Sequence, residues 1–318
     1  MKHRLLGLLV LGLLASAVLV TGVSAATTVF ATGMAVPESI TQTASGNFFV
    51  PDANGKIWNV PAAGGAATQA ADLSPTGGSL RGGLILPSSF GSVGGRFLFV
   101  GADNSGLLAG TMDTSTFTTS TYHSVPSNSI WTQPVLAPSF GSLSGDVLVT
   151  KQAVTGVLGS VDYFTPSGTV GTLATFSALP NVSPFGAALA ESSFGGVGGP
   201  SLIVSDAVGG GIYTVDTGGN IKLFTTIALG TGQSGLRQIA FAPKEWKKYG
   251  GDLFVSLTTR DIDVVNRDGV VIGKISGAFN PRGLLFTTIA GKPTLLSSNS
   301  KDGSILQAGP GDVVPVAS

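Results

Sequence analysis

One short phrase, a glycine followed after one to three residues by a run of large apolar residues, recurs six times along this chain. It begins at Gly46, Gly95, Gly145, Gly199, Gly251 and Gly291. The phrases follow one another at a nearly constant interval, which shortens only before the last of them. Self-similarity at a period of roughly 50 residues is typical of a fold that repeats one supersecondary unit. The chain is therefore expected to consist mainly of six copies of one module.

Each module is predicted to contain four short strands. The glycine phrase supplies the second strand, and a strand of small and apolar residues such as 187–189 precedes it. Turns such as Gly209-Gly210-Gly211 and Asp268-Gly269 lead into the later strands, because glycine supplies the positive φ that tight turns require. Beyond position 26, no long stretch shows sustained helical periodicity. The sequence therefore predicts an all-β protein.

Six modules of four strands predict a six-bladed β-propeller of four-stranded antiparallel blades over residues 26–318. A β-helix has much shorter coils, and a two-sheet sandwich does not give six in-phase repeats. Seven blades remain the alternative. The ring must close, because unpaired edge strands invite aggregation. The last module lacks a fourth strand, which we expect from Thr27 to Ala31 rather than from Val313 to Ala317.

The segment 1–25 has the pattern of a signal peptide. Lys2, His3 and Arg4 precede an apolar run from Leu5 to Val20, and small residues end at Ala25. The run is shorter than the roughly 20 residues that a membrane-spanning helix needs. We expect cleavage after Ala25 or Ala26, with an uncleaved anchor as the alternative. The protein is then exported, periplasmic or extracellular, without a membrane span after cleavage, and monomeric.

Composition excludes several classes of function. Lys plus Arg and Asp plus Glu both total 17, so a nucleic-acid binder with a basic surface is excluded. The absence of cysteine excludes disulfides, thiolate metal sites and cysteine nucleophiles. His3 and His123 are the two histidines, which excludes a His-rich zinc site. His123 lies in a Ser/Thr-rich stretch that predicts an outer strand or an exposed loop.

Several segments resemble NHL-repeat and SMP-30/gluconolactonase-like propellers. The segments 37–40, 45–52 and 54–57 resemble their opening blade, and 279–284 is similar to their repeat start. The resemblance covers most of the chain after the leader and implies a six-bladed propeller. In the lactonase branch it also implies a divalent cation, such as Ca²⁺, held at the axis by a Glu and by Asn or Asp. Glu38 matches the first ligand position, and Asn181 lies near the start of the fourth inner strand.

Six side chains are predicted to meet at one mouth of the central channel. Four of them lie at one fixed offset before the middle four glycines, and local motifs give the other two. The six are Glu38, Arg81, Trp131, Phe185, Arg237 and Arg282. Like charges about 8 Å apart repel by about 2 kcal/mol per pair at an effective dielectric near 20. The arginines therefore converge only if they are solvated, paired with Glu38 or matched by an anion.

These residues favour a pocket for a small anionic molecule. Arginine holds carboxylates in a bidentate fork, and aromatic rings beside it offer a stacking face. The alternative is structural: each arginine bonds carbonyls of neighbouring blades and fastens the ring. In function, we expect an exported propeller that binds a small anion or another exported protein. The alternative is a metal-assisted, lactonase-type hydrolase, which ranks second because only Glu38 matches the catalytic pattern cleanly.

Two smaller clusters are predicted to be structural. Asp261 and Asp263 point to one face of a strand that ends in the turn 266–269, which predicts a solvated hairpin. Three lysines surround Trp246, which predicts a surface loop with a packed tryptophan.

Overall fold

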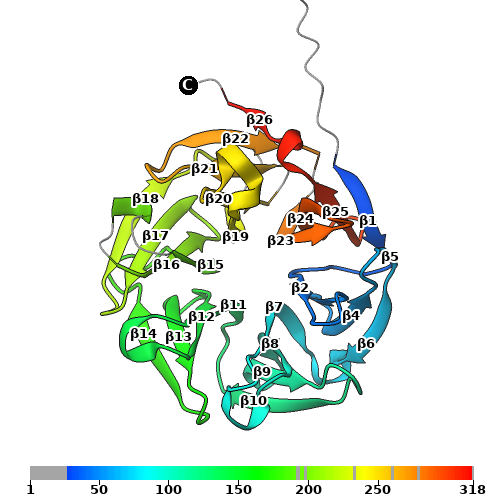
Figure 1. Ribbon diagram of the computed structural model, residues 1–318. Coiled ribbons are helices and arrows are strands. Elements are labelled where there is room, and N and C mark those ends of the chain that lie inside the picture. The colour runs from blue at the N-terminus through cyan, green and yellow to red at the C-terminus, as the bar shows by residue number, and fades with distance from the viewer. Residues whose placement is uncertain are drawn as a thin grey trace, which may run out of the picture.

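The chain forms a ring of six β-sheets around a central axis (Figure 1). The computed structural model describes residues 27–190, 194–196, 199–231, 234–258, 261–277 and 280–316. Six sheets within these ranges confirm the predicted six-bladed propeller and exclude seven blades. The predicted leader at residues 1–25 lies outside the described residues. In the ranges given, no helix has the length and apolar character needed to cross a membrane.

The first three blades each have four strands in chain order from the axis outward. Blade 1 consists of β2 (Thr41–Gln42), β3 (Phe48–Pro51), β4 (Lys56–Val60) and β6 (Thr68–Asp72). Blade 2 consists of β7 (Ser79–Ile85), β8 (Phe97–Asp103), β9 (Gly106–Met112) and β10 (Thr119–Val125). Blade 3 consists of β11 (Trp131–Leu136), β12 (Val147–Lys151), β13 (Ser160–Phe164) and β14 (Val170–Thr175).

The last three blades also begin at the axis, but blade 5 has an extra outer strand, and the two outer strands of blade 6 come from the N-terminal part of the chain. Blade 4 consists of β15 (Pro184–Ala190), β16 (Ser201–Asp206), β17 (Gly211–Asp216) and β18 (Ile221–Thr226). Blade 5 consists of β19 (Leu236–Phe241), β20 (Leu253–Leu257), β21 (Ile262–Val265), β22 (Val271–Ile275) and β26 (Val314–Pro315). Blade 6 consists of β23 (Pro281–Ile289), β24 (Lys292–Asn299), β25 (Ser304–Ala308), β1 (Thr28–Thr32) and β5 (Gly65–Ala66).

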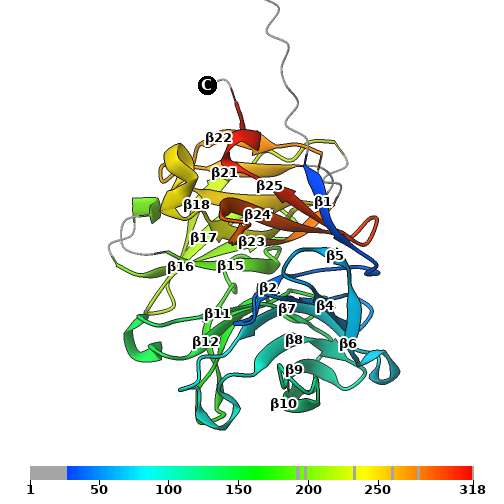
Figure 2. The same cartoon turned by 45° about the vertical axis from the view of Figure 1, so that its right-hand side comes forward.

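The N-terminal strand closes the ring. β1 pairs antiparallel with β25 as the fourth strand of blade 6, and Figure 2 shows the two lying side by side. β26 pairs instead with β22 at the outer edge of blade 5. β5 adds a short parallel strand to β1. The structure thus confirms closure by the N-terminal segment, and the C-terminal segment covers a different edge.

The core consists of apolar clusters at the interfaces between blades. Successive side chains of a strand point to opposite faces of its sheet, so each strand feeds two clusters. On β3, Phe48 and Val50 pack against blade 6, whereas Phe49 packs against blade 2. The other four blade interfaces have clusters of the same kind. This packing explains why the glycine phrase has consecutive large apolar residues rather than alternating ones.

Aromatic side chains fill the links between inner and second strands in blades 2 to 5. Phe90, Phe140, Phe194 and Trp246 are all buried. They lie at or beside the short 3₁₀ helices η2 (Gly91–Val93), η3 (Gly141–Leu143), η4 (Phe194–Gly196) and η5 (Lys244–Tyr249). Two more such helices are η1 (Ser74–Thr76) and η6 (Pro310–Asp312). The packed tryptophan predicted at position 246 is confirmed.

Candidate functional site

An extra residue interrupts every inner strand near its start. In blade 4, Phe185 and Gly186 together face the single residue Ser205 of β16. The same excess of one residue occurs in β7, β11, β19 and β23, and in the segment around β2. Such β-bulges bend a strand and redirect its side chains, often beside functional sites. The residues in these bulges include Glu38, Arg81, Phe185, Arg237 and Arg282.

A hydroxyl group opposite the bulge of blade 4 satisfies the backbone groups that the bulge leaves unpaired. The Ser205 Oγ accepts the Gly186 N–H at 2.8 Å. It also donates to the Arg237 carbonyl at 2.6 Å, which belongs to the inner strand of the next blade. The serine therefore stabilises its own bulge and ties blade 4 to blade 5.

Hydroxyls in blades 3 and 5 do the same. Thr150 Oγ1 donates to the carbonyl of Phe185 at 2.6 Å, and Ser256 Oγ donates to that of Arg282 at 3.0 Å. Thr150, Ser205 and Ser256 each follow directly the valine of the glycine phrase. That regularity is visible in the sequence and is the signal by which these residues could have been found.

Glu38 is the acidic centre of the site. It is completely buried, and Arg81 Nη1 donates to its Oε1 at 2.5 Å. Arg282 Nη1 lies 4.0 Å from the other oxygen, Oε2, which accepts no hydrogen bond from the described residues. The side chains of Arg81 and Arg282 are 24% and 17% exposed, so each is partly in contact with solvent. One buried carboxylate thus faces two guanidinium groups.

Arg237 has no such partner. Its guanidinium lies 4.8 Å from the centre of the Phe185 ring. Among the described residues it forms no hydrogen bond or ion pair, and its Nε is buried. Burial, followed by repulsion from Arg282 and Arg81, lowers the pKa of Arg237 to about 10, although Glu38 opposes the shift. The group therefore still carries its positive charge at neutral pH.

Arg282 completes the group. Its Nε donates to Ser300 Oγ at 3.2 Å. Burial lowers the pKa of Arg282, Glu38 opposes that shift, and Arg81 adds to it. The Glu38 contacts of Arg81 and Arg282 place these three residues together, and Arg237 is close enough to interact electrostatically with all of them. The four charged residues, which we name the axial cluster, carry three positive charges and one negative charge.

The arginine side chains do not fasten the ring through backbone carbonyls, although Arg81 of blade 2 binds Glu38, which precedes β2 of blade 1. Within the described ranges, no guanidinium of the axial cluster donates to a backbone carbonyl. The hydroxyls of Thr150, Ser205 and Ser256 make those contacts between blades instead. The bonds to carbonyls of neighbouring blades, which the structural alternative assigned to the arginines, are therefore made by these hydroxyls. The side chains of Arg81 and Arg282 face Glu38 instead.

Trp131 lies apart from the axial cluster. Its Nε1 donates to Asp162 Oδ2 at 2.8 Å, and its ring packs edge-on against Phe164 between blades 2 and 3. The bulge of this blade begins one residue later, at Thr132. Phe140 follows Thr132 by eight residues, whereas Phe194 follows Phe185 by nine. The offset that leads from the other three of the middle four glycines to a bulge residue therefore leads from Gly145 to Trp131, one residue before the bulge of blade 3.

Glu38 and Asn181 do not fit a divalent-cation site. Asn181 is exposed on the link between β14 and β15, where it lines a cavity of about 490 Å³ with Leu158 and Val208. Calcium requires six to eight oxygen ligands. In the described part of the chain, no group of three His, Cys, Asp or Glu side chains is placed to hold a metal ion. Around Glu38, guanidinium groups occupy the places where a cation would need further oxygens.

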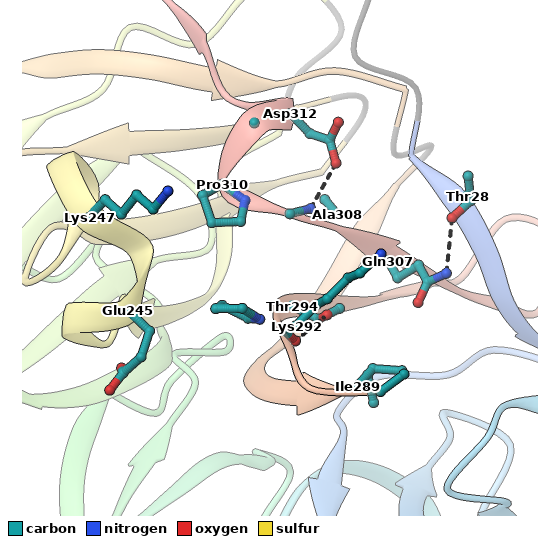
Figure 3. A pocket seen from close by; sticks show the side chains of 14 residues that line it. Thr28, Glu245, Lys247, Ile289, Lys292, Thr294, Gln307, Ala308, Pro310 and Asp312 are labelled. Atoms are coloured by element: carbon teal, nitrogen blue, oxygen red, sulfur yellow. Dashed lines mark hydrogen bonds between the residues drawn. The ribbon is translucent and has the colours of Figure 1, made fainter.

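A second cavity lies away from the axis, between η5, η6 and the turn that joins β23 to β24 (Figure 3). Its volume is about 700 Å³. Two lysines, Lys247 and Lys292, and two acids, Glu245 and Asp312, line it. The cavity lining therefore has no net formal charge. It differs in this respect from the axial cluster.

The other polar clusters noted in the sequence have structural surroundings. His123 lies on β10, the outer strand of blade 2, where it is partly buried and stacks on Phe164 at 5.6 Å. Asp263 is also partly buried, so the hairpin predicted to be solvated is solvated only in part. Asn266 forms the predicted turn by accepting the backbone N–H groups of Asp268 and Val270.

No protein-family model and no curated protein sequence matches this chain. Solved structures do match. A gluconolactonase from Xanthomonas campestris is 13% identical over 91% of this chain and 88% of its own, with a TM-score of 0.61. The PQQ-bound aldose sugar dehydrogenase from Streptomyces coelicolor is 16% identical over 88% and 96%, with a TM-score of 0.57.

Virginiamycin B lyase from Staphylococcus aureus is also similar, at 16% identity over 84% of this chain and 78% of its own, with a TM-score of 0.55. At these identities the likeness concerns the fold. The chain therefore has the six-bladed propeller fold of gluconolactonase-like proteins, as the resemblance in its sequence predicted.

Proposed function

We propose that this protein is an exported propeller that binds a small anionic molecule, with a carboxylate group, at the axial cluster. One observation carries the proposal: the Arg237 guanidinium is partly buried, is charged at neutral pH and has no hydrogen-bonding partner among the described residues. Buried donors without a partner cost free energy, and a carboxylate accepts from a guanidinium in bidentate geometry. A bound carboxylate would supply the missing partner.

The backbone supports the same conclusion. Arg237 and Arg282 lie in bulges whose carbonyls are held by Ser205 and Ser256. Their backbones are therefore fixed by contacts that do not involve the guanidinium groups. A site whose residues are positioned before the ligand arrives loses less entropy on binding.

The similar solved structures do not indicate one reaction for this protein, because they include a lactonase, a sugar dehydrogenase and a lyase on one fold. The Arg81 contact to Glu38 favours binding over metal-assisted hydrolysis, since it places a positive charge on one oxygen of the carboxylate that matches the lactonase pattern. The pattern of residues 1–25 supports export. N-terminal sequencing of secreted protein tests that part, with a new terminus expected at Ala26 or Thr27.

Titration calorimetry of the purified protein with propionate, benzoate and succinate tests the site. We expect at least one of them to bind and Arg237→Met to weaken that binding about 10- to 100-fold, the value of a charge-assisted hydrogen bond. Arg237→Lys should retain part of the affinity because it keeps the charge. Arg267→Met is the matched control, because Arg267 is exposed on a turn of blade 5. The proposal fails if no carboxylate binds, or if Arg237→Met binds as tightly as the unaltered protein.

A further inference from the structure

We infer that the ligand of the axial cluster is a small dicarboxylate, a molecule with two separate carboxylate groups. This inference rests on the proposed function and goes beyond it, because it states the charge and the layout of the ligand. It follows from how the charges of the cluster are already paired and from where the unpaired groups are held.

The axial cluster carries more positive than negative charge. Glu38 is in direct contact with Arg81 at 2.5 Å, so those two charges compensate each other. Arg282 lies 4.0 Å from Glu38 Oε2 without a hydrogen bond to it, and Arg237 has no ion pair within the described ranges. Two guanidinium charges therefore remain. A ligand with one negative charge would leave one of them unpaired in partly buried surroundings, which is unfavourable.

The guanidinium groups of Arg237 and Arg282 contact different neighbours. Arg237 leans over Phe185, which belongs to blade 4. Arg282 is held by Ser300 and faces Glu38, which precedes β2 of blade 1. The two guanidinium groups are therefore drawn toward opposite neighbours, although β19 and β23 are consecutive inner strands. Two carboxylates joined by a short carbon chain suit this layout better than one phosphate with both charges on a single centre.

A third observation concerns unpaired donors. Three N–H groups on bulge residues are buried without a partner among the described residues: Arg81 Nε, Arg237 Nε and Gln238 Nε2. Ionised carboxylates only accept hydrogen bonds, and each has two oxygens with which to do so. A dicarboxylate therefore offers acceptors for such donors, which a sugar hydroxyl offers less strongly.

Matched pairs of compounds test the inference. Succinate, glutarate and adipate are each titrated against the protein at neutral pH beside their monomethyl esters, which keep the carbon chain and lose one charge. We expect one diacid to bind about tenfold tighter, or more, than its own ester. Arg282→Met should reduce that ratio to near one, while the ester retains its contact with Arg237. Methyl phosphate, with two charges on one group, should bind more weakly than the best diacid.

The outcomes separate this inference from the proposed function. If neither diacids nor esters bind, the proposed function fails and the inference fails with it. If an ester binds as tightly as its diacid, the anion site stands and the inference is overturned. Tighter binding of methyl phosphate than of every diacid also overturns it, in favour of a phosphate monoester. Melting temperatures of Arg282→Met and the unaltered protein show whether the variant is folded.

Discussion

The Ser205 hydroxyl of blade 4 donates a 2.6 Å hydrogen bond to the backbone carbonyl of Arg237 in blade 5. The backbone of Arg237 is thus tied to the neighbouring blade, while its guanidinium has no hydrogen-bonding partner among the described residues. The two parts of one residue have separate tasks, since the main chain holds the ring together and the side chain faces the axial cluster. Stability and binding can therefore be altered separately.

Removal of the Ser205 hydroxyl tests the stabilising part. Ser205→Ala leaves the Gly186 N–H and the Arg237 carbonyl without this partner inside the ring. Buried groups left unpaired cost about 1–3 kcal/mol, so the free energy of unfolding should fall by that amount. Urea denaturation of the variant beside Ser167→Ala, an exposed turn serine, measures the difference. Equal midpoints for the two variants would show that the hydroxyl does not fasten the blades.

The inner strands of blades 4 and 5 approach so closely at Gly186 that a larger residue there should destabilise the fold. A Cβ added at Gly186 would lie 2.3 Å from the Arg237 carbonyl oxygen and 2.8 Å from the Gln238 Cα. Both are backbone atoms of the next blade and cannot rotate away, so Gly186→Ala should destabilise the fold by about 1–3 kcal/mol or more. Gly311→Ala is the control, because a Cβ there meets nothing within 4 Å. A melting temperature as high as that of the control would mean that the ring adjusts its spacing freely.

The partly buried carboxyl group of Asp263 should make the free energy of unfolding depend on pH. Burial, with the nearby Asp261 adding to it and Lys274 opposing it, raises the pKa of Asp263 to about 6. The folded chain then binds more protons than the unfolded chain between pH about 4 and about 6. The free energy of unfolding contributed by this group therefore falls as the pH rises through that range and stays low above it.

Asp263→Asn should remove this dependence. At neutral pH the variant should be more stable than the unaltered protein by about 1–2 kcal/mol, less than the full shift allows because the carboxyl is partly exposed. Near pH about 4 the two proteins should be similar. Guanidinium denaturation at both pH values gives the difference, in which the contribution of Asp252, whose pKa is also raised to about 6, cancels. A variant that is less stable at neutral pH would contradict the sign.

The fold could be predicted from the sequence because each blade must bury both faces of its second strand. That requirement leaves consecutive large residues after every glycine, as in Phe48, Phe49 and Val50, and six such phrases fix the number of blades. Closure by the N-terminal strand was predictable for a similar reason, because the last module lacked one strand. Pairing of β26 with β22 was not, since two residues at an outer edge leave no periodic pattern.

The axial cluster was predicted only in part. Repeat spacing assigned Arg81 and Arg237 to the cluster, and local motifs assigned Glu38 and Arg282. The spacing misplaced Trp131, because the link in blade 3 is one residue shorter. A bulge adds a residue without a sequence mark of its own, so neither the bulges nor the pairing of Arg81 with Glu38 followed from the spacing. Asn181 does not share a site with Glu38, because it lies in the link between β14 and β15. In such a link, the distance along the chain does not determine the direction of a side chain.

Ring closure gives the last prediction. Phe30 on β1 is buried and meets Phe48 of blade 1 edge-on at 5.6 Å, so one side chain joins the two ends of the ring. Phe30→Ala should cost about 3–5 kcal/mol, as for other buried aromatic residues, and lower the melting temperature of the whole domain. Val29→Ala on the same strand is the matched control, since Val29 is 58% exposed and its truncation should change little. If Phe30→Ala melts like Val29→Ala, β1 contributes no closure energy and blade 6 is held by β23, β24 and β25 alone.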